Sequence, residues 1–405
     1  MAKASQNAPR VQLVGESVAF GQDVLDRLQH VKAHLEIGKA SEITLRLDNS
    51  SDAITDSKAL AEGNIIHLYL GYGVGLDHVC SGEIQKWAPN FPRDGKRVVE
   101  IKALDLSHRA MDTDKYQKKA GGAHRNTRDS DIAKQYISKR MGLYPDVDST
   151  SGTVRRFHKK GVSDYQFISR IALLAGYYFW VDYDMAKGRW VGHFKSKGNV
   201  YASQDEMYSF MYGNDSSVSL INFKPEFQMR GQTTEVEVVG YDTKTKKTIR
   251  QIVREEKTGA SSKFVDTDPI DDQIVSGASV VFTALGNRHE VISNKPFRSA
   301  KAALAYAKRF MKSRGENFLT GVGNVVGTAE LRPMQIHKLG GIGTRFTGKW
   351  ELTRVVHEVG GDAPYEVEFS SRKVYDPTKT RAGEEYVQTV ARQLLKEYYG
   401  LKLSD

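Results

Sequence analysis

The stretch of sequence that decides the fold is residues 161–182, GVSDYQFISRIALLAGYYFWVD. Ser163 is followed three residues later by Gln166, and this spacing predicts a capping box that opens a helix by satisfying free backbone N–H groups. Apolar residues then recur at helical spacing up to Gly176, a residue suited to the left-handed position at which helices commonly end. Residues 177–182 are mostly aromatic or β-branched and predict a strand. The stretch therefore predicts a helix–strand unit of an α+β module.

Two helices are expected to supply the core of this module. The apolar residues of the first helix are Phe167, Ile168, Ile171 and Leu174. We expect the helix to pack beneath Tyr178 and Trp180 of the strand. A second, upstream helix is predicted to start with Ser130 as its cap and to end at Gly142. Its apolar residues are Ile132, Tyr136, Ile137 and Met141.

The sequence before this module favours strands. In residues 42–48, apolar and polar side chains alternate with the period of two that a half-buried strand shows. Residues 64–72 are rich in apolar side chains and lead into glycines at which the chain can reverse. The other elements predicted here are strands at 81–87 and 97–106 and a short helix near 24–34. Residues 1–110 are therefore predicted to form an antiparallel sheet, as a small barrel or a sandwich.

Strands return after the module. Residues 234–240 and 248–253 predict a hairpin across a polar turn, and a helix is predicted at 300–313 with Ser299 as its cap. Later strands are predicted at 336–337, 348–357 and 365–369. The final segment, 383–399, has an apolar stripe at helical spacing and predicts an amphipathic helix.

Two parts of the chain share a pattern. Residues 66–87 run from an Ile-His pair through a glycine-rich reversal to a strand that contains Trp87, and residues 336–350 repeat this order up to Trp350. In this alignment His67 matches His337. A pattern that occurs twice predicts two β-domains of one design.

The predicted fold class is α+β and mainly β, with two antiparallel β-domains, an inserted α+β module and a C-terminal helix. The predicted division is 1–110 for the first β-domain, 111–213 for the inserted α+β domain, 214–256 with 320–376 for the second β-domain, 257–319 for an insertion with a helix, and 377–405 for the C-terminal amphipathic helix.

Composition excludes several classes of protein. Of 405 residues, 40% are hydrophobic and 27% are charged, which is typical of globular chains and not of low-complexity ones. The longest apolar run, 171–181, is about half of the roughly 20 residues that a membrane-spanning helix needs. Residues 1–10 are polar, so we expect no secretory signal. A single cysteine, Cys80, allows neither an internal disulfide nor a thiolate metal cluster.

Positive charge is concentrated in one segment. Residues 112–197 contain 17 basic and 9 acidic side chains, a net charge of +8 out of +10 for the whole chain. Such a face suits an acidic partner, such as nucleic acid, an anionic wall polymer or an acidic protein, although a solvated exterior explains it more simply. The run 155–160 mixes basic and aromatic residues as single-strand binders do, but its place before Ser163 favours a surface loop.

No catalytic, cofactor or metal site is predicted. The glycines of 321–327 lack the dinucleotide spacing, and those of 340–343 lie between strands, where glycine serves a turn. The histidines show no metal-ligand spacing, and neither a serine elbow nor a signature around Cys80 points to a nucleophile. The paired carboxylates, which strand alternation would direct to a solvent face, are Asp182 with Asp184 and Glu366 with Glu368.

Residues 161–182 resemble the signature of the late control protein D family, which comprises phage tail hubs and the hub half of the VgrG spike of type VI secretion. The residues that carry this resemblance are Ser163, Asp164, Phe167, Ile168, Arg170, Ile171, Gly176, Tyr178 and Phe179. Residues 327–369 are similar to a second pattern of the family, at Leu331, Pro333, Phe346, Gly348, Leu352, Thr353, Val355 and His357. The chain departs from that pattern at Ala329, where proline is usual, and at Met334, where glycine is usual.

The resemblance implies a homotrimer with two tube-like barrels per chain, arranged as a pseudo-sixfold ring that adapts a sixfold tail tube to a threefold spike. The internal repeat agrees with this, since two barrels in three chains give six near-equivalent docking surfaces. The implied partners are the spike protein, the tail tube or tube-initiator protein, baseplate wedge proteins, the tape-measure protein and DNA in the channel. The implied location is the tail baseplate of the virion, assembled in the host cytoplasm.

Three functions stay open. A structural, non-enzymatic hub without a fused spike is favoured, because no enzymatic insertion and no spike β-helix is visible. The alternatives are a wall-degrading enzyme, and a nucleic-acid or envelope-binding module or VgrG-like secretion hub. In a hub, the predicted helix 383–399 packs on its own chain or docks on a baseplate partner. The partner-interface candidates are Tyr386, Val390, Leu394, Tyr398 and Tyr399.

Overall fold

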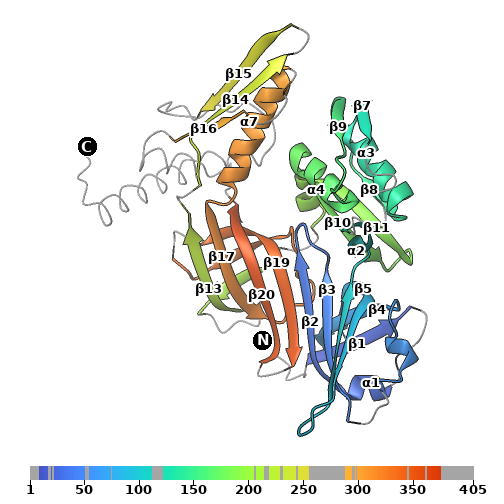
Figure 1. Cartoon of the computed structure of the whole chain (residues 1–405). Helices are drawn as coiled ribbons and strands as arrows, with labels where there is room; N and C mark the ends of the chain where they lie inside the picture. The colour runs from blue at the N-terminus through green and yellow to red at the C-terminus, as the bar shows by residue number, and fades with distance from the viewer. Residues whose placement is uncertain are drawn as a thin grey trace.

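The structure is a computed structural model and confirms the predicted class, α+β and mainly β (Figure 1). It describes residues 9–16, 20, 22–50, 54–73, 75–111, 122–204, 207–213, 219–228, 231–242, 245–254, 288–293, 297, 299–343, 346–360 and 363–374.

The first six strands form an antiparallel sheet in the order β1-β4-β5-β6-β3-β2. They are β1 (Pro9–Gly15), β2 (Leu28–Glu36), β3 (Glu42–Asp48), β4 (Ile65–Tyr72), β5 (Gly75–Asn90) and β6 (Val98–Leu104), with the short helices α1 (Gln22–Asp26) and η1 (Lys58–Leu60) between them. The predicted helix near 24–34 is wrong beyond Asp26. Val31, Ala33 and Leu35 are buried in alternation, which is the pattern of a strand with one face on the core.

The second set of strands closes into a six-stranded barrel. Its order is β19-β18-β12-β13-β17-β20, and β20 pairs back with β19. Its members are β12 (Ser209–Tyr212), β13 (Ser219–Phe227), β17 (Leu319–Val326), β18 (Ile336–Gly340), β19 (Gly348–Gly360) and β20 (Ala363–Val374). Trp350 and Phe369 are fully buried in its interior.

The two sets are continuous with each other. β2 of the first set pairs antiparallel with β19 of the barrel, so that one 12-stranded sheet runs through both (Figure 1). Among the described residues, the edge strand β2 of the first set pairs with β19 of the barrel. No pairing of β1 with β2 closes the first set into a barrel of its own in these residues. A single hydrophobic core contains side chains of both sets, including Leu45 and Val355.

The second set repeats the first in strand order. If β1 to β6 are matched with β12, β13, β17, β18, β19 and β20, every pair of neighbouring strands in the first set recurs in the second. One orientation differs, since β1 runs antiparallel to β4 whereas β12 runs parallel to β18. The irregularities recur as well. The β2–β3 ladder shifts register between Leu28 and His30, and β13–β17 shifts between Leu220 and Asn222.

A second matched bulge lies in the ladders of β5 with β6 and of β19 with β20. The register shifts between Ile84 and Lys86 in one ladder and between Leu352 and Arg354 in the other. Because β-bulges occupy specific positions in a fold, two matched bulges show that the two sets are copies of one design.

The register of the repeat differs from the prediction. When the matched bulges are aligned, Glu83 matches Glu351 and Trp87 matches Val355. Ile65 lies opposite Glu83, and Ile336 lies opposite Glu351. Ile65 therefore matches Ile336, and Ile66 matches His337. The predicted matching of His67 with His337 is therefore wrong by one residue, and a shift of one residue moves a side chain to the opposite face of a strand.

The inserted module lies above the first set in Figure 1 and has its own core. Its helices are α2 (Ser107–Met111), α3 (Asp129–Gln135), the π-helical turn η3 (Tyr136–Arg140), α4 (Asp164–Ala175) and α5 (Lys197–Ala202). Its strands are β7 (Ala123–Thr127), β8 (Tyr144–Val147), β9 (Val154–Phe157), β10 (Tyr177–Asp184) and β11 (Arg189–Ser196), in sheets β10-β11-β8 and β7-β9.

Local signals in the module are confirmed, with one exception. The Ser163–Gln166 capping box forms at the start of α4, and Gly176 ends the helix in the left-handed region, with φ of 73°. The N-cap of α3 is Arg128, so Ser130 lies in the first turn of the helix and not at its cap.

The strand face that packs on α4 differs from the prediction. Phe179 and Val181 of β10 contribute to the module core with Phe167 and Ile171, whereas Tyr178 faces the barrel and bonds Glu351. The reason is strand alternation, which sends residues 179 and 181 to one face and residues 178 and 180 to the other.

A third unit stands above the barrel in Figure 1. It is the sheet β15-β14-β16 covered by α7 (Ala300–Gly315), with β14 (Glu235–Asp242), β15 (Lys247–Arg254) and β16 (His289–Ile292). The predicted hairpin forms, and Ser299 Oγ accepts from the Ala302 N–H as the predicted cap. These strands were expected in the second barrel. They lie outside it because Val236 and Val238 pack against α7.

Candidate functional site

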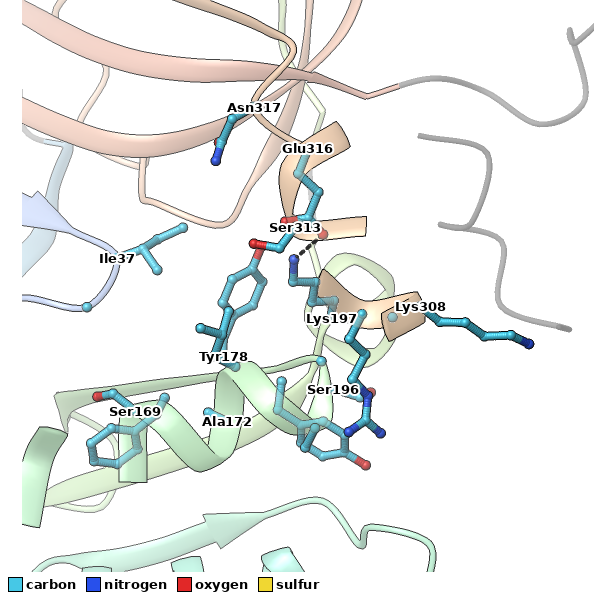
Figure 2. A pocket seen from close by; sticks show the side chains of 18 of the residues that line it. Ile37, Ser169, Ala172, Tyr178, Ser196, Lys197, Lys308, Ser313, Glu316 and Asn317 are labelled. Carbon is cyan, nitrogen blue, oxygen red and sulfur yellow. Dashed lines mark hydrogen bonds and ion pairs between the residues drawn. The ribbon is translucent and has the colours of Figure 1, made fainter. Parts of the chain in front are cut away.

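A cleft opens where the module, the barrel and α7 meet (Figure 2). Its volume is about 1240 Å³. The turn after β2 contributes Ile37, β10 contributes Tyr178, and the end of α7 contributes Ser313 and Glu316. Residues of all three parts line the cleft, so its polar side chains can join the parts.

A network of charged side chains lies along the wall of the cleft, which Lys197, Glu316 and Arg372 help to line. The guanidinium of Arg372 on β20 donates from Nε to Glu351 at 2.6 Å, from Nη1 to Glu316 at 2.7 Å and from Nη2 to the Tyr178 hydroxyl at 2.8 Å. Lys197 Nζ donates to Glu316 at 2.7 Å, as Figure 2 shows, and the Tyr178 hydroxyl donates to Glu351. The two carboxylates and two cations balance, and Glu351 is only 1% exposed.

Burial and charge act together on these groups. Burial, with the carboxylate of Glu351 beside it, raises the pKa of Tyr178 well above its ordinary value. Burial alone would lower the pKa of Arg372, but Glu351 and Glu316 outweigh it and the pKa is raised. Burial and the charge of Arg372 lower the pKa of Lys197 against the pull of Glu316. All nitrogens of the guanidinium bond protein groups, so the arrangement is suited to holding parts together.

A second polar joint connects the module to the first set of strands. The hydroxyl of Tyr183 on β10 donates to Glu16 at 3.0 Å, and its ring lies 4.6 Å from that of His67. Ser81 Oγ lies 2.7 Å from His67 Nδ1 and 2.8 Å from His78 Nε2. Burial lowers the pKa of both histidines, that of His78 to about 4, so they are neutral at pH 7.

A sequence model of the Alg8 N-terminal domain matches residues 22–361, most of the chain. The chain belongs to the Alg8 N-terminal domain family. This name differs from that of the late control protein D family, which therefore stays a prediction. Among curated proteins, no sequence matches.

Solved structures show a shared fold. A tail protein from Neisseria meningitidis MC58 is 10% identical with a TM-score of 0.63, over 90% of this chain and 97% of that one. The 43 kDa tail protein of prophage MuSo2 from Shewanella oneidensis is 13% identical with a TM-score of 0.60, over 90% and 98%. An E. coli component of the type VI secretion system, described as similar in structure to the T4 bacteriophage tail proteins gp27 and gp5, is 10% identical with a TM-score of 0.53, over 90% and 79%. The fold is thus one found in tail and secretion-system proteins.

In this member of the Alg8 N-terminal domain family, the paired carboxylates have protein partners. Asp182 bonds His193 at 2.9 Å and Asp184 bonds Lys187 at 2.7 Å. On β20, Glu366 bonds Asn324 and Glu368 bonds Arg354. Each carboxylate is thus engaged in holding neighbouring strands or a turn.

The glycine runs have structural roles. Gly341 and Gly343 adopt φ of 74° and 78° in the turn after β18, as expected for a turn. Gly321 and Gly323 are strand residues of β17, and a Cβ at either would meet the ring of Phe223 at under 3 Å. Their missing side chains therefore make room for an aromatic ring in the barrel.

The remaining predicted features are placed as follows. Part of the basic run forms β9, where Arg156 donates twice to Asp129, at 2.8 and 2.7 Å. Cys80 is buried. The partner-interface candidates Tyr386, Val390, Leu394, Tyr398 and Tyr399 lie outside the described residues, as does the whole predicted helix 383–399.

In the part of the chain that the structure describes, each helix is too short or too polar to span a membrane. In that same part, no three His, Cys, Asp or Glu side chains gather so as to hold a metal ion.

The charged network itself was not predicted. One signal was available in the sequence, since Glu351 interrupts the apolar strand around Trp350 and Leu352. Its partners could not be found this way, because Tyr178 is 173 residues distant.

Two buried histidines make the fold sensitive to acid. His357 donates from Nε2 to the Leu331 carbonyl at 3.0 Å and faces the Tyr365 hydroxyl with Nδ1, also at 3.0 Å. His337 accepts the Tyr208 backbone N–H on Nδ1 at 3.1 Å. Burial lowers the pKa to about 3 for His357 and about 4 for His337, so both are neutral in the folded chain.

Acidification from pH 7 to 5 is expected to destabilise the fold by about 2 kcal/mol for each of these histidines. The unfolded chain binds a proton on each below pH about 6.5, whereas the folded chain does not until far lower, so stability falls as pH falls. Denaturant unfolding at both pH values measures the loss. His337→Gln should remove the contribution of one histidine from the loss of unfolding free energy between pH 7 and 5. A loss as large as that of the parent chain would contradict the assignment.

Proposed function

We propose that the chain is a structural baseplate hub of a phage or phage-like contractile tail, and that it has no enzymatic activity. Three copies form a ring of six matched strand units that adapts a sixfold tail tube to a threefold spike. The observation that carries the proposal is the duplication of the six-strand unit, with the same strand order and bulges at the same places.

Duplication supports the ring because of symmetry. A closed ring of three copies with two similar units each presents six similar surfaces to a sixfold partner while keeping threefold symmetry for the other. The shared fold with tail proteins from Neisseria meningitidis and Shewanella oneidensis supports the same assignment. The polar joints fit a scaffold, since they fix the module to both strand units.

In this proposal, residues 1–110 and the barrel strands build the ring, and residues 111–213 form a separate domain attached to it. The spike protein binds on one side, the tail tube or tube-initiator protein on the other, and wedge proteins at the periphery. The tape-measure protein and DNA pass through the channel. The protein resides in the tail baseplate and is assembled in the host cytoplasm.

Light scattering of the purified chain, alone and with spike and tube partners, is expected to give a trimer. Negative-stain images are expected to show a threefold ring with a central hole. A chain that stays monomeric with both partners present would contradict the proposal.

A VgrG-like secretion hub is a second candidate, favoured by the fold shared with the E. coli type VI component. The two are separated by the tube protein that co-purifies with the trimer, from a phage tail or from a secretion system.

We further propose that the predicted helix 383–399 docks on the spike or a wedge protein through Tyr386, Val390, Leu394, Tyr398 and Tyr399. A chain that lacks residues 382–405 should then trimerise and melt normally but lose its spike or wedge partner. Aggregation or failure to trimerise would place the helix in the hub's own core.

A further inference from the structure

The contact between the two strand sets follows a defined register. Residues 31–36 of β2, the second strand of the first set, pair with residues 354–359 of β19, the fifth strand of the second set. The facing apolar pairs Val355 with Leu35 and Val359 with Val31 are all buried.

β2 and β19 each have a matching strand in the other strand set. β13 of the second set matches β2, and β5 of the first set matches β19. The edges of β13 and β5 that correspond to this contact are largely unpaired within the described part of the chain. Among the described residues, β13 pairs with β17 along one edge, while its other edge pairs with β12 only at residues 219–220. β5 pairs with β6 along residues 83–90, but its edge toward β4 is paired only up to Glu83.

We propose that these two edges join one copy of the chain to the next, with β13 of one copy lying along residues 86–91 of β5 and its following turn in another copy. This rests on the proposed ring. It gives the ring contact a register, because the pairing within the chain predicts which residues face each other between copies.

The side chains on these edges support the contact. In the predicted register, Trp87 faces Phe227 as Val355 faces Leu35 within the chain. Likewise, Phe91 faces Phe223 as Val359 faces Val31. Phe91 is 54% exposed and Phe223 is only partly buried, whereas the matched valines are at most 8% exposed. Phe91 exposes an aromatic ring at this edge, while Trp87, Phe223 and Phe227 are partly buried beside the core, and this arrangement supports an interface between subunits.

Prolines make this contact different from the one within the chain. The Ile37 N–H donates to the Thr353 carbonyl at 3.0 Å, and antiparallel alternation then places Ala33 and His357 in a hydrogen-bonded pair. The matched residues are Pro225 and Pro89, and neither has an N–H to donate.

The missing donors have a physical consequence. A continuous hydrogen-bonded ladder is interrupted at these two residues, so the two strands lie side by side in register with fewer hydrogen bonds between them. The copies are therefore joined by side-chain packing, and the prolines protect both edges from indiscriminate strand pairing before assembly.

The partner that binds each edge is a second copy of this chain. Both complementary edges, β13 and residues 86–91, belong to the same molecule, so each copy can pair with the next. A contact between two different surfaces is heterologous, so it either closes a ring or grows an open filament.

Cysteine cross-linking tests the register. Ala88 and Glu226 match Val356 and His34, a facing pair outside the hydrogen-bonded positions, where Cα atoms lie about 4.5 to 6 Å apart, within disulfide range. The only native cysteine, Cys80, is buried, and burial raises its pKa to about 12, so it stays unreactive. Under mild oxidation, Ala88→Cys with Glu226→Cys is expected to give a covalent trimer. The control, Ala88→Cys with Lys224→Cys, is two residues out of register and should cross-link at least about tenfold less.

The outcomes separate the two proposals. A trimer by light scattering that does not cross-link, or that cross-links equally in both variants, overturns the register and leaves the hub proposal standing. A covalent ladder beyond the trimer supports the register and contradicts the closed ring. A monomer without cross-links overturns both.

A second pair of variants measures the side-chain contact. Phe91→Asp is expected to weaken trimerisation by more than about tenfold while leaving the melting of the subunit unchanged. Phe157→Asp, at a 62% exposed site of the module, is the matched control and should do neither. Equal trimerisation of the two variants would overturn the aromatic contact.

Discussion

Arg372→Met is expected to lower the free energy of unfolding by about 3–5 kcal/mol. The change removes three hydrogen bonds at once and leaves the carboxylate of Glu351 buried without its cation. A buried charge that loses its partner is strongly destabilising because it can be neither solvated nor paired. Denaturant unfolding measures the effect, and limited proteolysis tests whether the module separates from the barrel.

Two further variants define the cause. Arg354→Met removes a cation from the neighbouring strand, where the Arg354–Glu368 pair is 28% and 43% exposed, and should cost no more than about 1 kcal/mol. Adding Glu351→Met to Arg372→Met should recover part of the loss, because no carboxylate then lacks its partner. Equal losses in Arg372→Met and Arg354→Met would mean that the network does not hold the parts together.

Phe167→Ala is expected to destabilise the α+β module by roughly 3–5 kcal/mol. Phe167 is 5% exposed, its ring stacks on that of His158 at 4.4 Å, and it contacts Tyr136 at 5.1 Å. The substitution leaves a cavity between groups that are held by their own hydrogen bonds, since His158 bonds Tyr136 at 3.1 Å and the Val162 carbonyl at 2.6 Å. Such neighbours cannot collapse into the space.

The matched control is Leu173→Ala on the same helix. Leu173 is 64% exposed, so its loss should change stability by about 0.5 kcal/mol or less. Thermal unfolding of both variants measures the difference. If Phe167→Ala melts like the parent, α4 is peripheral to the module core and our account of that core is wrong.

The sequence by itself determined the local elements of this chain. The Ser163–Gln166 spacing specified a helix start, Gly176 specified its end, and alternation specified the strand at 42–48. Such signals lie within a few residues of each other, so backbone propensity and one buried face suffice to produce them. The duplication was also visible, because each copy carries its own strand pattern.

Only the tertiary structure decided how these elements pair. His67 and His337 looked equivalent, yet the strand partners differ by one residue in register and so place them on opposite faces. β2 is completed by β19, more than 300 residues later in the chain, and Glu351 meets Tyr178 across a sequence separation of 173. These contacts depend on which surfaces meet once the elements are formed, and no local pattern near either residue encodes its partner. The pattern of charged and apolar side chains indicated which faces must be buried. Packing between distant segments determined the surface against which each face is buried.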